Sequence, residues 1–259
     1  MIEQTQFGSS QGYTGPAEFL SGLDARYELL GAPGLFKNSD QANRVLQDPE
    51  FNAAFLALGA DRGLKGLGLY ISGPATFVTK KPIHRMADMA GMKIRVTSSA
   101  MQMDQIRGIG ATPVPMALGE VLPALQQGAI DGVMGNAPVF ASAKYYSVAK
   151  YQTVTDQMMY CSIIVTSKSW FEKLPPDLQQ VIVRDARKVS EGIQEYALQR
   201  IKDAEAEWVS AGGELLRLPA DDQTTLMVSP KGVGEKIASG QAKESEMYQK
   251  LLGALSRNQ

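Results

Sequence analysis

The feature that most constrains the fold is an unusually long helical pattern over residues 177–211. Apolar side chains recur there every three or four residues, and Gly192 is the one glycine in a run without proline. Prolines at 175–176 precede the run and glycines at 212–213 follow it, as helix boundaries favour. At roughly 1.5 Å per residue this is about 50 Å of helix, which is too long for one small compact domain. Because no regular heptad emerges, we expect a spine shared by two lobes rather than a coiled-coil arm.

Strand and helix signals alternate along the rest of the chain, which predicts an α/β fold. Short apolar runs at 66–71, 92–96 and 129–134 are typical of buried strands. Between them, helical patterns at 99–109 and 118–127 each end at a glycine. This order favours βαβ units, in which ligands bind near the carboxyl ends of the strands.

The composition excludes several classes of function. Lys and Arg number 26 against 27 Asp and Glu, so the net charge of −1 offers no basic surface for nucleic acid. One cysteine (Cys161) and one histidine (His84) disfavour a Ser-His-Asp triad, a Cys-His pair and a clustered metal site. No apolar run reaches the roughly 18 residues of a membrane span. These observations favour a soluble binding protein, and we expect neither a metal nor a cofactor.

Arg95 is the side chain that most suggests a binding site. It stands near the end of an apolar strand, just before the Ser98-Ser99 cap of the next helix. Burying a guanidinium costs free energy unless an anion meets it. Two interpretations stay open: a clamp for an anionic ligand, helped by the positive end of the helix, or an internal salt bridge to Glu120 or Asp131.

Other chemistry-bearing residues favour structural roles. Glu120 opens a helix, where a carboxylate suits the helix dipole, and Asp131 begins a turn. The loop 8–13 is rich in glycine but lacks the lysine and the helix that a phosphate loop requires, so we expect a tight turn with small polar groups. His84 reads as a surface residue and Cys161 as a buried, inert thiol. Six methionines fit a core or an adaptable pocket wall, with the core favoured: Met86, Met89, Met92, Met101, Met103 and Met116.

Two segments carry a resemblance to a known family. Residues 91–96 read GMKIRV and residues 110–132 read GATPVPMALGEVLPALQQGAIDG. These runs resemble the solute-binding proteins of tripartite ATP-independent periplasmic (TRAP) transporters, of the C4-dicarboxylate-binding type. Residues 32–36, 81–91 and 170–175 resemble neighbouring segments of that family, so the resemblance covers nearly the whole chain. It implies two α/β lobes that close over a ligand and are crossed by one long helix.

The resemblance also implies a binding site. Arg95 matches the arginine that pairs with the ligand carboxylate, and Leu118 matches a position that lines the pocket. A polar site position matches either Gly135 or Asn136, with the register open by one residue. The candidate ligand-binding set is completed by Met116, Ser98 and Tyr13, and no catalytic residue is expected.

Two departures from the family pattern bear on these expectations. The family often carries a second arginine shortly after the glycine that matches Gly73, where this chain has Ala75. Losing that charge favours a monocarboxylate or a less polar organic acid over dicarboxylates and sialic-acid-like ligands. The chain also begins after the family's signal peptide and opening β-α-β-α unit, so the N-terminal part of lobe one is expected to be missing.

The expected organisation places 1–73 and 161–190 in lobe one and 74–160 and 200–259 in lobe two. The long helix, 177–211, is expected to bridge both lobes. This division is based on Gly73-Pro74 and the segment 151–160, which look like strands that cross between the lobes.

The expected function is capture of a small organic acid in the periplasm and its delivery to the membrane subunits of a TRAP transporter. The chain itself is expected neither to bind nucleic acid nor to be embedded in a membrane. An alternative is an enzyme that acts on a small organic acid, with Glu120 and Asp131 as acid and base. A third possibility is a module that presents the long helix to a partner.

Overall fold

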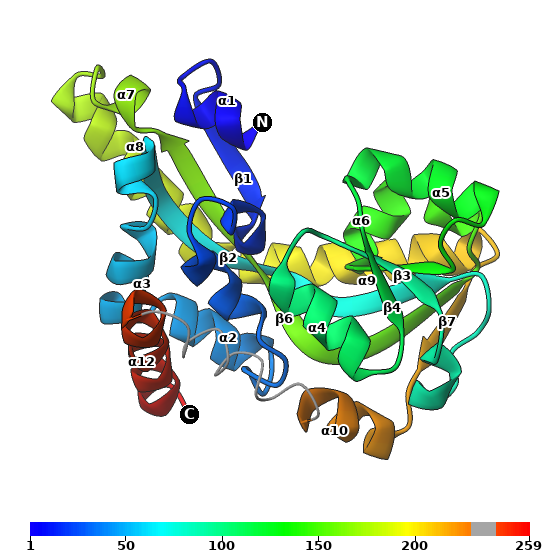
Figure 1. Cartoon of the computed structure of the whole chain (residues 1–259). Helices are drawn as coiled ribbons and strands as arrows, with labels where there is room; N and C mark the ends of the chain where they lie inside the picture. The colour runs from blue at the N-terminus through cyan, green and yellow to red at the C-terminus, as the bar shows by residue number, and fades with distance from the viewer. Residues whose placement is uncertain (229–241) are drawn as a thin grey trace.

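The computed structural model describes residues 1–228 and 242–259, which form one open mixed sheet with helices packed around it (Figure 1). The order of the strands is β1-β6-β2-β5-β3-β4, with β7 beside β6. The α/β class expected from the sequence is confirmed. The strands are β1 (Gly12–Pro16), β2 (Leu64–Thr79), β3 (Lys93–Val96), β4 (Thr112–Pro115), β5 (Gly132–Gly135), β6 (Tyr151–Ser167) and β7 (Glu214–Arg217).

Several of the short helices begin where the sequence supplies a capping side chain. Asn38, Asp48 and Ser99 each accept a hydrogen bond from the first turn of a helix. The cap of the helix after Arg95 is therefore Ser99 and not Ser98. The α-helices are α1 (Ile2–Gln6), α2 (Ser39–Leu46), α3 (Pro49–Leu56), α4 (Ala100–Gly108), α5 (Val121–Gln127), α6 (Ala137–Ser142), α7 (Lys168–Phe171), α8 (Pro176–Gly192), α9 (Gln194–Ser210), α10 (Ala220–Val228) and α12 (Ala242–Arg257). The 3-10 helices are η1 (Ala17–Leu20), η2 (Ala25–Gly31), η3 (Ala60–Arg62), η4 (Met86–Met89), η5 (Leu118–Glu120) and η6 (Tyr145–Ser147).

Two long antiparallel strands, β2 and β6, run across the molecule (Figure 1). The first of them is longer than the strand expected over 66–71, because β2 continues through Gly73-Pro74 to Thr79. Its pairing with β6 shifts register between Ile71 and Gly73 and again between Pro74 and Thr76, and a proline is tolerated at such irregularities. Gly73 has φ +127, and a Cβ there would lie 2.9 Å from Cδ1 of Ile201.

The buried apolar side chains fall into separate clusters along these strands. Ile71 and Cys161 belong to a first cluster with Tyr27 and the phenylalanines of α3. Phe77 and Tyr160 belong to a second cluster. The strands thus pass from one core to another close to Gly73. We propose that the two lobes meet at this point.

The C-terminal helix α12 packs against α2 and α3, as Figure 1 shows at the lower left. Met247 and Leu251 belong to the first cluster, and Arg257 donates to Asp48 through Nε and Nη2, each at 2.8 Å. The apolar side chains of α12 therefore complete the first core, although 200–259 is expected from the sequence to lie with the second lobe. Residues 229–241, which the expected second lobe includes, lie outside the described residues.

The long helical pattern forms α8 and α9, which follow one another with Ile193 between them. Ile193 keeps helical angles (φ −75, ψ −12), accepts from Ala197 N at 2.9 Å and donates to Val189 O at 2.9 Å. Ile193 therefore divides the expected single helix into two, directly after Gly192, which is a weak helix former. The two halves do not fold back on each other as a hairpin.

The two helices differ in what their apolar stripe contacts. On α9, Ala204 and Trp208 are buried against neighbouring elements. On α8, Leu178 and Val189 remain exposed. Helix α8 instead approaches β2 through small residues, since a Cβ on Gly68 would collide with the Ser190 side chain.

Trp208 is expected to anchor α9. It is fully buried in a cluster with residues of the second half of the sheet, and its Nε1 donates to Lys150 O at 3.1 Å. Replacing Trp208 with Ala should lower the free energy of unfolding by about 3–5 kcal/mol, measured by denaturant titration. Tyr196→Ala on the same helix, at 64% exposure, should change it by no more than about 0.5 kcal/mol. Equal losses in both variants would contradict this packing.

Candidate functional site

Two adjoining cavities meet at Arg95. The inner cavity has a volume of about 110 Å³ and is also lined by Gly135, Asn136, Phe140 and Tyr160. The outer cavity, of about 460 Å³, is also lined by Glu18, Ser98, Ser99 and Met116. Four residues line both cavities, so we treat the two as one site: Phe19, Arg95, Thr97 and Leu118.

The topology explains why these side chains converge. Strand β3 lies between β4 and β5 in parallel register, with Arg95 beside Val114 and Val133. The carboxyl ends of β3 and β5 therefore lie close together, where Thr97 and Asn136 begin the following segments. Ligands bind in α/β sheets at such strand ends. Helix η1 contributes Phe19 from the side of the first core.

Arg95 is 5% exposed and has no carboxylate within 4 Å among the described residues. Its Nε and Nη2 both donate to Met116 O, at 3.1 and 2.9 Å. Burial lowers the pKa of its guanidinium from the usual value. One carbonyl satisfies two of the five N–H groups and supplies no full negative charge, so the guanidinium retains capacity for an anion.

The alternative of an internal salt bridge from Arg95 is excluded by where the two acids lie. Glu120 Oε2 accepts from Ala117 N at 3.1 Å and closes the turn η5. Asp131 Oδ2 accepts from Lys93 N at 2.8 Å. Both carboxylates thus serve the backbone, as their sequence contexts predict.

Glu18 is a site residue that sequence reasoning missed. It is 6% exposed, lines the outer cavity and accepts from Gln102 Nε2 at 2.6 Å. Burial, reinforced by the nearby Glu28, raises the pKa of its carboxyl to about 8, against the opposing influence of Arg95. The only sequence signal was an acid within the apolar segment 16–20.

Glu28 has a structural role outside this site. Its two carboxylate oxygens accept from Ala100 N and Met101 N, at 3.2 and 3.1 Å, in the first turn of α4. An anion there complements the positive end of the helix dipole. Of Glu18 and Glu28, it is Glu18 that lines the cavity.

The other expected site residues separate into two groups. Leu118, at 43% exposure, lines both cavities, Gly135 and Asn136 line the inner one, and Ser98 and Met116 line the outer one. Both residues of the ambiguous register therefore face the site. Tyr13 lines neither cavity, because its ring lies over Gly15 on β1 and packs on the first core. Three aromatic residues that line the inner cavity were not expected: Phe19, Phe140 and Tyr160.

Asn136 links the site to the crossing strands. Its Oδ1 accepts from Val139 N at 3.3 Å and so caps α6. Its Nδ2 donates to Ser72 O at 3.4 Å, and Ser72 Oγ in turn lies 2.8 Å from Ser162 Oγ on β6. The position of this amide is therefore set by the strands that join the two cores.

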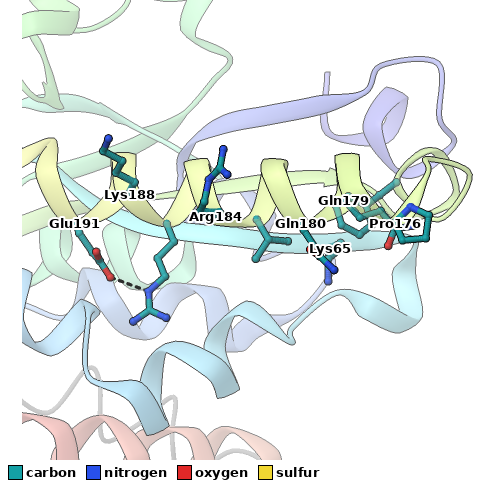
Figure 2. Close-up of a pocket in the computed structure, with 10 residues that line it drawn as sticks. Lys65, Pro176, Gln179, Gln180, Arg184, Lys188 and Glu191 are labelled. Carbon is teal, nitrogen blue, oxygen red and sulfur yellow. Dashed lines mark hydrogen bonds and ion pairs between the residues drawn. The ribbon is translucent and has the colours of Figure 1, made fainter.

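A larger hollow of about 720 Å³ lies along α8 and next to Lys65 of β2 (Figure 2). Its cations do not converge: Figure 2 shows Arg184 and Lys188 projecting on one side of the helix and Lys65 lying below it. Arg184 pairs with Asp185, and Arg187 pairs with Glu191, each at 2.7 Å and exposed to solvent. Exposed pairs of this kind contribute little. The described residues that line this hollow include no buried charge that could orient a small ligand. The cavities at Arg95 do contain such a charge.

Within residues 1–228 and 242–259, no three His, Cys, Asp or Glu side chains gather as a metal site would need. No helix in those ranges combines the length and apolar character needed to cross a bilayer.

Comparisons with known proteins agree on one family. Residues 1–240 match the model described as bacterial extracellular solute-binding protein, family 7. The uncharacterized protein YiiZ of Salmonella typhimurium is 32% identical over 191 residues, covering 73% of this chain and 58% of YiiZ. The 2,3-diketo-L-gulonate-binding periplasmic protein YiaO of Escherichia coli is 28% identical over 84% of this chain and 60% of its own length. The chain thus spans about three fifths of these relatives.

A solved structure shows the same fold. The TRAP periplasmic solute-binding protein of Desulfovibrio salexigens, crystallised with orotic acid, superposes with a TM-score of 0.92 at 27% identity. The match covers 100% of this chain and 84% of that protein. The expected α/β fold is therefore confirmed as that of a TRAP periplasmic solute-binding protein.

The buried Glu18 carboxyl predicts a pH dependence of stability. The folded state holds this proton up to about pH 8, whereas the unfolded chain releases it near pH 4.5. Between these values the folded state binds more protons, so its stabilisation is lost as the pH rises. Relative to Glu18→Gln, the wild type should lose up to a few kcal/mol of unfolding free energy between pH 5 and 8.5, measured by denaturant titration. The exposed control Glu120→Gln should follow the wild-type profile, and parallel profiles for wild type and Glu18→Gln would refute the prediction.

Proposed function

The chain belongs to family 7 of the bacterial extracellular solute-binding proteins, and on that premise we propose that it captures a small organic acid for a TRAP transporter. On this proposal it works in the periplasm and delivers its ligand to the membrane subunits of the transporter. No bond of the ligand is made or broken. The ligand carboxylate pairs with Arg95, and the residues around it set the shape of the ligand.

One observation carries the proposal: Arg95 is buried, lines both cavities and has no carboxylate partner among the described residues. A desolvated guanidinium with free N–H groups offers strong charge-assisted hydrogen bonds to a carboxylate. Val133, Met134 and Phe140 supply apolar walls in the inner cavity. Such a site is typical of small-ligand recognition, with few polar groups in an apolar surround.

The position of the site supports closure of two lobes over the ligand. Phe19 and Glu18 come from η1, whose Ala17 and Leu20 belong to the first core. Arg95 comes from β3, whose neighbouring residues belong to the second core. We assign 1–72, 161–190 and 242–257 to the first lobe and 74–160 and 200–226 to the second. Movement about β2 and β6 would then open and close the site.

The ligands named for the relatives agree with this chemistry. Orotic acid and 2,3-diketo-L-gulonate, named for the Desulfovibrio and Escherichia proteins, each carry a carboxylate. By extension, this chain binds an organic acid through the same kind of group. The enzyme alternative finds no support in the geometry, because Glu120 and Asp131 bond to the backbone in separate places instead of converging on a cavity.

Arg95 variants test the proposal. Arg95→Lys keeps the charge but loses the planar fork, so affinity for organic acids should fall at least tenfold, or about 1.4 kcal/mol. Arg95→Ala should abolish measurable binding while the protein stays folded. Isothermal titration calorimetry with mono- and dicarboxylates measures both effects. Arg107→Lys, an exposed arginine on α4, is the matched control and should bind like the wild type. Unchanged affinity in Arg95→Lys would return Arg95 to a structural role.

A further inference from the structure

The site pairs one cation with one acid. Among the described residues that line the two cavities, Arg95 is the only basic side chain and Glu18 the only acidic one. Both are more than nine-tenths buried, and no salt bridge within 4 Å joins them. A ligand carboxylate that reaches Arg95 therefore enters a buried space that already holds a carboxyl group.

Two carboxylates close to one guanidinium cannot both stay ionised without a large cost in a desolvated site. Arg95 is the one cation among the described titratable and charged groups that act on or respond to the Glu18 carboxyl, and the others do not relieve this cost. Those others are Glu28, Tyr13, Tyr160 and Cys161. Glu28 adds a second negative charge, which further favours a proton on Glu18.

A second carboxylate on the ligand has no second cation to pair with among the described residues that line the site. The inner cavity presents Val139 and Phe140, and its amide, Asn136, already donates to Ser72 O. The outer cavity presents Glu18 and the serines of the β3–α4 turn. A second negative charge would therefore lose hydration without meeting a cation, at a cost that hydroxyl groups alone do not offset.

From this juxtaposition we propose that Glu18 is a specificity residue: it holds a proton while Arg95 binds the ligand, and so the site accepts acids with a single carboxylate and rejects dicarboxylates. The inference rests on the proposed function and narrows its substrate class. The protonated carboxyl donates a hydrogen bond, which a keto or hydroxyl oxygen of the ligand can accept. Gln102, through its bond to Oε1, fixes the orientation of the carboxyl.

The test measures affinity by calorimetry at pH 6 to 9 with two monocarboxylates, orotate and 2,3-diketo-L-gulonate, and two dicarboxylates, succinate and malate. The wild type should bind at least one monocarboxylate at least tenfold more tightly than either dicarboxylate. Its affinity should fall by up to tenfold per pH unit once Glu18 ionises. Repeating the titration at pH 8.5 in buffers of different ionisation enthalpy should show uptake of up to one proton per ligand bound.

Glu18→Gln should remove these effects while keeping the shape of the side chain. The affinity of this variant for the monocarboxylate should vary less than threefold between pH 6 and 9, and binding should take up no proton. The ratio of its affinities for the monocarboxylate and the dicarboxylates should be smaller than in the wild type. Glu120→Gln removes an exposed acid near Leu118 and should keep the wild-type profile. Wild-type binding that is flat with pH, or equal for both ligand classes, would overturn the role of Glu18 and leave the proposed function intact. Failure of all four acids to bind would overturn the proposed function itself.

Discussion

The guanidinium of Arg95 is the group on which the site depends. Taking it out of water is costly, and the carbonyl of Met116 offsets only part of that cost. The fold accepts the cost by placing Arg95 in the middle strand of a parallel trio, β4-β3-β5, where its backbone is held on both sides. Glu120 and Asp131 are engaged elsewhere with backbone N–H groups. The charge is thus kept in place and left open toward the cavity.

The β2–β6 ladder ties this charge to the rest of the molecule. Each strand serves two cores in turn, and the ladder changes register where it passes between them. Gly73 takes a backbone angle there that other residues disfavour, and Ser72 joins Ser162 and the Tyr160 carbonyl across the strands. The amide of Asn136 bonds to the same point. A change in angle between the cores would therefore move a wall of the cavity, which is how closure could reach the ligand.

The sequence was a good guide where one local signal dominates. The unbroken apolar period predicted the α8–α9 rod, and the isolated Arg95 predicted a charge in need of an anion. It failed where long-range packing decides. A glycine followed by a proline commonly ends a strand. Here the pairing of β2 with β6 is irregular around Gly73-Pro74, and β2 continues beyond it. Glu18 sits in a short turn of 3-10 helix, and only the approach of α4 and β6 turns it into a buried acid. The apolar residues of α8 fit a helix period, but periodicity does not state which element, if any, covers them.

Charge balance connects the two buried groups of the site. With a proton on Glu18, the empty site carries the single positive charge of Arg95, and binding of one carboxylate brings it to neutrality. The ligand carboxylate then offsets the desolvation cost of the guanidinium, which is largest when closure removes the remaining water from the site. A dianion would instead leave the closed site negative, with apolar walls around the excess charge. Closure is therefore favoured most by a ligand that cancels one charge, so the same interaction can set both affinity and selectivity.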